Sequence, residues 1–188
     1  MMAFMLLAKR LILVSVLAVT VTAFSKTINN ADVEVMVNDP RLVNHEMVSE
    51  MLDWLDKTSP YARMPGQTVD IRFANKKFLI EEWKRNGGSR DIDIYALTTV
   101  DIHTRKIIVY IPLNFNWESH RDQTHLMHEI VHNQQYMYYK DYNIDCINDM
   151  EYEAYMLALT WFMEKNIDDV VFVTDRLKKL DSYADCPG

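Results

Sequence analysis

Residues 119–138 read SHRDQTHLMHEIVHNQQYMY, and this stretch predicts the helix around which the fold is built. Ser119 is followed three residues later by Asp122, a variant of the capping box that favours a helix beginning near His120. Apolar residues then recur at helical spacing, so the helix is expected to run to about Tyr138. These apolar positions are Leu126, Met127, Ile130 and Val131. The stretch therefore predicts an amphipathic helix with an apolar back.

The front of that helix carries side chains suited to metal binding. At about 100° per residue, His128, Glu129 and His132 fall on one face. Histidines four residues apart point two imidazoles at one ion, and the intervening glutamate can take a proton from a metal-bound water without being a ligand. Zinc lowers the pKa of such a water to about 7. The motif HEIVH thus predicts a catalytic zinc site, and two ordinary hydrogen-bonded histidines are the alternative.

A catalytic zinc site needs one more protein ligand and one open position. The sequence EYEAY, residues 151–155, begins 19 residues after His132, where a second helix is expected. With these two motifs the chain resembles the gluzincin type of zinc metallopeptidase, in which HExxH on one helix is completed by a glutamate on the next. The resemblance covers about residues 119–162 and implies that Glu151 is the third ligand. Tyr155 stands where the family usually has an aspartate that steadies a zinc-bound histidine.

Two alternatives remain open at this second motif. With Asn148 as helix cap, Glu151 would be the third residue of a capping box, and Glu153 would then be the ligand. Glu151 and Glu153 lie about 200° apart on a helix, so they cannot both face the metal. His125 shares the face of the HEIVH histidines, where we expect an ordinary solvated or hydrogen-bonded side chain; a residue that contacts substrate or caps the cleft is the alternative.

The remaining pattern predicts an α+β fold, with a small sheet followed by the helix of residues 120–138 and further helices at the C-terminal end. By the same resemblance the fold is expected to be zincin-like. The expected helices are 44–56, 76–85, 149–165 and 168–183, and the expected strands are 68–73, 94–100 and 106–113, the last two forming a hairpin.

The strand of residues 106–113, KIIVYIPL, is apolar on both faces. Such a strand is either covered on both sides or lines a cleft with one edge. Zincin-type enzymes bind extended peptide along an edge strand beside the metal, so this strand is the candidate site for substrate to add as a further strand.

The first 23 residues carry Lys9 and Arg10 before an apolar run and end in small residues, which predicts a cleavable export signal. An uncleaved membrane anchor is the alternative. Residues 24–42 are expected to be a linker and residues 43–188 the metallopeptidase domain. Export to the periplasm or the outside would favour a disulfide between Cys146 and Cys186, with two free thiols as the alternative.

The formal net charge of −7 and the scattered basic residues disfavour a nucleic-acid partner. Together these observations lead us to expect a zinc metallohydrolase that holds one Zn²⁺ per chain and hydrolyses peptide bonds in peptide or protein substrates. His128, His132 and Glu151 would hold the metal, and Glu129 would act as general base on the water. A zinc-containing domain that binds peptide or protein without cleaving it is the alternative.

Overall fold

The computed structural model describes residues 34–88, 94–101, 104–139, 147–165, 168–181 and 183. The predicted signal of residues 1–23 and the predicted Cys146–Cys186 disulfide lie outside these ranges, as does the first half of the predicted linker. Within the described ranges, no helix combines the length and the apolar composition needed to cross a membrane.

The four described strands form a mixed sheet. Its order is β1-β2-β4-β3, with β2 parallel to β4 and each outer strand antiparallel to its neighbour. The strands are β1 (Met36–Val37), β2 (Asp70–Ala74), β3 (Leu97–Val100) and β4 (Ile107–Pro112). The hairpin predicted from the sequence is confirmed as the β3–β4 pair.

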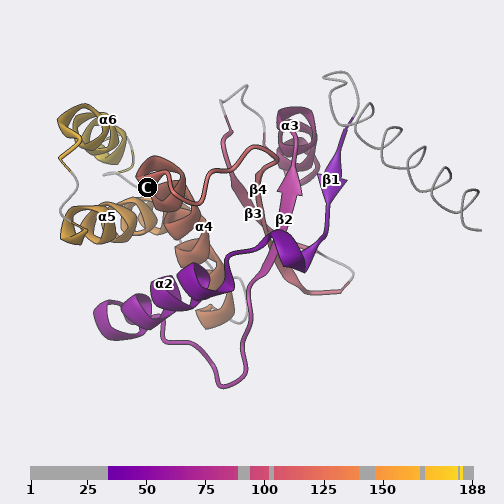
Figure 1. Cartoon of the computed structure of the whole chain (residues 1–188), viewed down its shortest axis with the longest axis horizontal. Helices are drawn as coiled ribbons and strands as arrows, with labels where there is room; N and C mark the ends of the chain where they lie inside the picture. Colours follow the sequence, from indigo (N-terminus) through magenta and orange to yellow (C-terminus); the bar gives the residue numbers. More distant parts are fainter. Residues whose placement is uncertain are drawn as a thin grey trace, which may run out of the picture.

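Five α-helices and one short 3-10 helix accompany the sheet in the part of the chain that the structure describes. They are η1 (Pro40–Leu42), α2 (His45–Thr58), α3 (Lys76–Arg85), α4 (His120–Tyr138), α5 (Ile147–Glu164) and α6 (Val170–Asp181). In Figure 1 the sheet lies on the right, with helices α2, α4, α5 and α6 gathered on the left. Helix α3 packs on one face of the sheet and α4 on the other, while α2 and α5 pack against α4 and share its core. The chain is therefore an α+β protein, as the sequence predicts.

Side-chain caps fix where the helices begin. The Ser119 hydroxyl accepts a hydrogen bond from the backbone N–H of Asp122 (3.3 Å), so α4 starts at the predicted residue. Asn44 does the same at α2 by accepting from the N–H of Met47 (3.1 Å). Each cap satisfies one of the N–H groups that the first turn of a helix leaves without an intrahelical acceptor.

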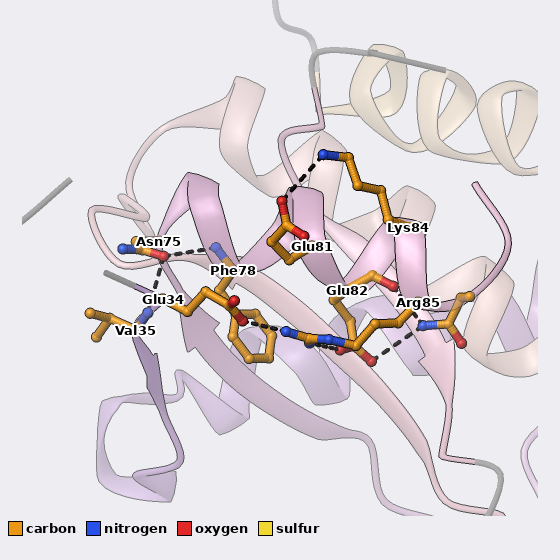
Figure 2. A network of polar contacts seen from close by, with 9 residues as sticks. Glu34, Val35, Asn75, Phe78, Glu81, Glu82, Lys84 and Arg85 are labelled. Carbon is orange, nitrogen blue, oxygen red and sulfur yellow. Dashed lines mark hydrogen bonds and ion pairs between the residues drawn. The ribbon is translucent and has the colours of Figure 1, made fainter. Parts of the chain in front are cut away.

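Asn75 caps α3 and also holds β1 in place (Figure 2). Its side-chain oxygen accepts from the N–H of Phe78 (2.9 Å) in α3 and from the N–H of Val35 (3.2 Å) beside β1. Arg85, at the end of α3, contacts the carboxylate of Glu34. Residues 24–42 are predicted to be a linker, but Met36–Val37 pair with β2, so the folded region begins before residue 43.

Strand β4 is not at an edge of the sheet, so the prediction that it guides a substrate is wrong. It pairs with β2 on one side and with β3 on the other. All of its residues are buried, with Val109 and Ile111 facing α4 while Ile108 and Tyr110 face α3. The apolar character of both faces therefore reflects burial on both sides, and β3 is an outer strand of the described sheet.

The main core lies between the sheet and helices α2, α4 and α5. Met51 of α2 is fully buried in it, whereas Met163 of α5 is 58% exposed. Removing a buried methionine side chain leaves a cavity and loses its transfer free energy, which together destabilise a fold by about 2–5 kcal/mol.

We therefore expect Met51→Ala to lower the free energy of unfolding by about 2–5 kcal/mol. Met163→Ala is the matched control, because the same change on an exposed helical surface alters stability by less than about 0.5 kcal/mol. Urea denaturation of both variants measures the difference. Equal stabilities for the two variants would contradict this description of the core.

Candidate metal centre

The packing of α4 against α5 brings together three side chains that the sequence analysis singles out as metal ligands. His128 and His132 lie one turn apart on α4, and Glu151 lies in the first half of α5. The Nε2 atoms of the two histidines are 3.0 Å apart, and each is 3.4 Å from a carboxylate oxygen of Glu151. All three ligand atoms lie within 4.8 Å of one another, a spacing that one metal ion can bridge.

The cluster is buried on the histidine side and more open on the glutamate side. The side chains of His128 and His132 are 12% and 10% exposed, whereas that of Glu151 is 30% exposed. A catalytic zinc site needs a position that water or substrate can reach, and a structural site is closed by four protein ligands. The burial pattern fits the first kind of site.

The electrostatics of the cluster favour a positive charge at its centre. Burial, the largest single influence, lowers the pKa of His132, but the hydrogen bond and charge of Glu151 and the charge of Glu129 together raise it to about 9. Burial and the neighbouring His132 lower the pKa of His128. Burial of Glu151 is outweighed by its hydrogen bonds to both histidines, which lower its pKa. In the metal-free protein a proton on His132 therefore supplies the charge that a cation would otherwise supply.

Glu129 lies beside the cluster without belonging to it. Its side chain is buried, and the Thr98 hydroxyl of β3 lies 2.8 Å from its Oε2 and 2.9 Å from its backbone oxygen. A hydroxyl donates a single hydrogen, so Thr98 orients Glu129 by donating to one of these two oxygens. The other carboxylate oxygen of Glu129 has no described contact with Thr98. It could therefore accept a proton, as a general base does.

Gln135 holds the ring of His132, a contact that the sequence analysis does not predict. Its side-chain oxygen accepts from Nδ1 of His132 (2.8 Å), which directs Nε2 toward Glu151. Its amide nitrogen donates to Glu153 (3.2 Å). Glu153 in turn accepts from the hydroxyl of Tyr61. A polar chain from Tyr61 to His132 thus fixes one imidazole from behind.

These contacts separate the two glutamates that the sequence leaves as alternatives. Glu151 faces the histidines, whereas Glu153 points to Tyr61 and Gln135. Asn148 lies inside α5, because the helix already includes Ile147. The alternative in which Asn148 caps the helix and Glu151 completes a capping box is therefore not the arrangement in this structure.

Tyr155 does not replace the aspartate that steadies a zinc-bound histidine in gluzincins. Its ring packs against the ring of His128, with 4.2 Å between centroids. The buried Nδ1 atom of His128 has no hydrogen-bond partner among the described residues. The two histidines are thus held differently, His132 by an amide and His128 by an aromatic ring.

His125 lies on α4 one turn before His128 and is not part of the cluster. Arg176 of α6 contacts its Nε2 atom (2.7 Å), and its ring lies 4.3 Å from that of Tyr95. Burial, together with the charge of Arg176, lowers the pKa of His125 to about 3. His125 is therefore a neutral, hydrogen-bonded histidine, as expected from the sequence.

The fold and the site define an α+β protein with a histidine–histidine–glutamate cluster between two helices. The chain belongs to the family described as Domain of unknown function (DUF6647), which matches residues 41–178 and so includes every residue of the cluster. Comparisons with curated proteins and with solved structures give no match.

In the metal-free protein at pH 7, we expect His132 to carry two ring protons and His125 and His128 to be neutral. His132 has a folded pKa above its ordinary value of about 6.5. Its proton therefore stabilises the fold fully below about pH 6.5, and this stabilisation is lost as the pH rises through about 9. Long-range ¹⁵N NMR spectra of the chelator-treated protein report the protonation of each ring. A neutral His132 at pH 7 would contradict this account.

Proposed function

We propose that this protein is a zinc-dependent hydrolase of the gluzincin-like type with a zincin-like fold, and that it acts as a peptidase. The observation that carries the proposal is the convergence of His128, His132 and Glu151, with Glu129 beside them but outside the cluster. Two histidines and one glutamate are a ligand set of catalytic zinc. The partly exposed Glu151 supports an open position in that ligand set.

Zinc bound by these residues would lower the pKa of a water molecule to about 7 and polarise a substrate carbonyl. Glu129 takes the proton of the attacking water on its free carboxylate oxygen and passes it to the leaving amine. Thr98 keeps the other oxygen of Glu129 in place. Gln135 keeps Nε2 of His132 directed into the site, since it occupies Nδ1 of the same ring.

The position of β3 at an edge of the described sheet is an argument for a peptide as the substrate. Thr98 of this strand contacts Glu129. An extended peptide can pair with the free backbone groups of an edge strand, which places its own peptide bonds at a fixed distance from the strand. We therefore propose β3, in place of β4, as the strand that positions the substrate. Action outside the cytoplasm follows from the export signal predicted for residues 1–23 and stays a prediction.

The second candidate function is a zinc-containing domain that binds peptide or protein without cleaving it. The ring of Tyr155 packs on His128 where gluzincins usually have a carboxylate, and this departure favours the second candidate. A structural metal stabilises the fold outright, so its removal would unfold the chain. The apolar packing of α4 on α5 through Leu126, Ile130, Ala154 and Ala158 needs no metal, which favours the catalytic function.

We expect wild type and Glu129→Gln to carry one zinc per chain and His132→Ala to carry none, when each is purified without chelator. Hydrolysis of a mixed peptide library should be seen for wild type alone, since Glu129→Gln keeps the ligands but removes the base. Mass spectrometry measures the metal and the cleaved peptides, and circular dichroism checks the fold with and without chelator.

The results of this experiment distinguish the hydrolase from the zinc-containing binding domain. For wild-type protein that contains zinc, either of two results would reject the catalytic proposal. One is hydrolysis that Glu129→Gln leaves unchanged, and the other is no hydrolysis together with unfolding on chelation. Wild-type protein that takes up no zinc on titration would reject both candidates.

Removal of the Gln135 contact should weaken zinc binding. We expect Gln135→Leu to lower the zinc affinity about 10–100-fold, because nothing then holds Nδ1 of His132. Gln134→Leu is the matched control: Gln134 is also buried on α4, but it bonds to Asn133 and Gln67. Competition with a chelator of known zinc affinity gives both constants. Equal affinities for the two variants would show that the Gln135 contact has no role in the site.

A further inference from the structure

Most arginines of the described residues are neutralised by a carboxylate. Arg41, Arg63, Arg72, Arg85 and Arg121 each contact an aspartate or glutamate within ion-pair distance. Arg105 has no such contact but is exposed, so water solvates its charge. Arg176 of α6 is different, because it is partly buried and no carboxylate of the described residues lies within ion-pair distance of it.

The described side chains that contact the Arg176 guanidinium are neutral, and the Tyr155 hydroxyl accepts a hydrogen bond from it. It lies 4.9 Å from the ring centroid of Phe172 and 5.6 Å from that of Tyr155. One of its nitrogens donates to the neutral ring of His125 (2.7 Å). Asp175, the acid next to it in sequence, is exposed and lies 3.9 Å from Lys178.

A guanidinium has five N–H donors in a planar fork, and the fork matches the two oxygens of a carboxylate. The described contacts of Arg176 use only part of this capacity. A partly buried cation without a counter-ion is unfavourable, since water that would solvate it has been removed. Burial accordingly lowers the pKa of Arg176. Arg176 therefore has N–H donors available for an anion and no counter-ion among the described residues.

Arg176 also lies close to the candidate metal centre. The ring of Tyr155 contacts Arg176 on one side and the ring of His128 on the other. Lys179, one turn further along α6, places its amine 5.9 Å from the centroid of the same tyrosine ring. Two cationic side chains of α6 thus lie against one ring that also contacts the cluster.

We propose that Arg176 is the centre of a carboxylate-binding subsite next to the metal centre, with Tyr155 as the wall between the two. The identity of the carboxylate rests on the proposed function: it would belong to a peptide substrate, as its C-terminal group or as an acidic side chain. The Tyr155 centroid lies 4.2 Å from that of His128 and 5.6 Å from the Arg176 guanidinium. An extended peptide spans about 3.4 Å per residue, so the recognised carboxylate would lie within about three residues of the cleaved bond. Arg176 is thereby a specificity-determining residue.

The test uses three probes, which are N-acetyl-tetraalanine, its C-terminal amide, and the same amide with glutamate at the third position. Each is titrated into full-length protein in chelator, and into zinc-treated Glu129→Gln, while the Nε–H NMR signal of Arg176 is followed. We expect the free acid or the glutamate amide to bind about ten-fold or more tightly than the plain amide and to shift that signal. The probe that succeeds identifies the source of the carboxylate.

Arg121 provides a matched control. It lies 5.6 Å from the ring of the same Phe172, but Asp169 neutralises it. Arg176→Gln should abolish the preference for the acid, and Arg121→Gln should keep it. Arg176→Lys retains the charge without the planar fork, so it should bind the acidic probe several-fold more weakly than wild type. This variant tests the subsite even if Arg176→Gln fails to fold.

Two results would overturn the subsite: equal binding of acid and amide by wild type, or an Arg176 signal that no probe shifts. These results are distinguishable from failure of the proposed function. Carboxylate binding in chelator without any zinc uptake would reject the hydrolase and leave the subsite. Zinc-dependent hydrolysis that is indifferent to acids in the substrate would reject the subsite and leave the hydrolase.

Discussion

The contact between α4 and α5 is the constraint on which the site depends. It buries an apolar seam that includes Leu126, Ile130, Ala154 and Ala158, and the small alanines let the two helices approach closely. The same approach forces His128, His132 and Glu151 into one small volume. Packing therefore supplies the free energy that holds together three groups that would otherwise prefer water.

Such a cluster requires a cation. Two buried imidazoles whose Nε2 atoms face each other at 3.0 Å cannot both carry a proton on Nε2, and the nearby carboxylate favours a positive charge between them. A single proton satisfies this requirement in the metal-free protein, and under the proposed function a divalent ion would replace that proton and bind both lone pairs. The polar chain from Tyr61 through Glu153 and Gln135 then orients His132 for either partner.

Local sequence signals predict most of the fold, and long-range pairing accounts for the rest. Helix α4 begins and ends as predicted, because the Ser119 cap and the apolar period both lie within the helix itself. Strand β1 is only two residues long, and Asn75, which bonds to the adjacent Val35, lies 40 residues further along the chain, so no local pattern reveals the strand. The position of β4 between β2 and β3 is likewise a property of strand order, and apolar composition alone could not distinguish a central strand from an edge.

The site shows the same division. His128, Glu129 and His132 can be predicted from the sequence because helical spacing alone puts them on one face. Choosing Glu151 over Glu153 needs the crossing of α5 over α4, which the sequence does not encode locally. Gln135 could have been suspected from its position three residues after His132, whereas Thr98 lies 31 residues from Glu129 and gives no signal.

Zinc-edge X-ray absorption spectroscopy tests the central claim most directly. For the zinc-loaded protein the account predicts two imidazole nitrogens at about 2.0–2.1 Å and a carboxylate oxygen at about 2.0–2.2 Å. Glu151→Ala should lose the carboxylate while Glu153→Ala leaves the nearest ligands unchanged. A zinc bound through sulfur or through a single imidazole, or a spectrum that Glu151→Ala does not alter, would contradict the account.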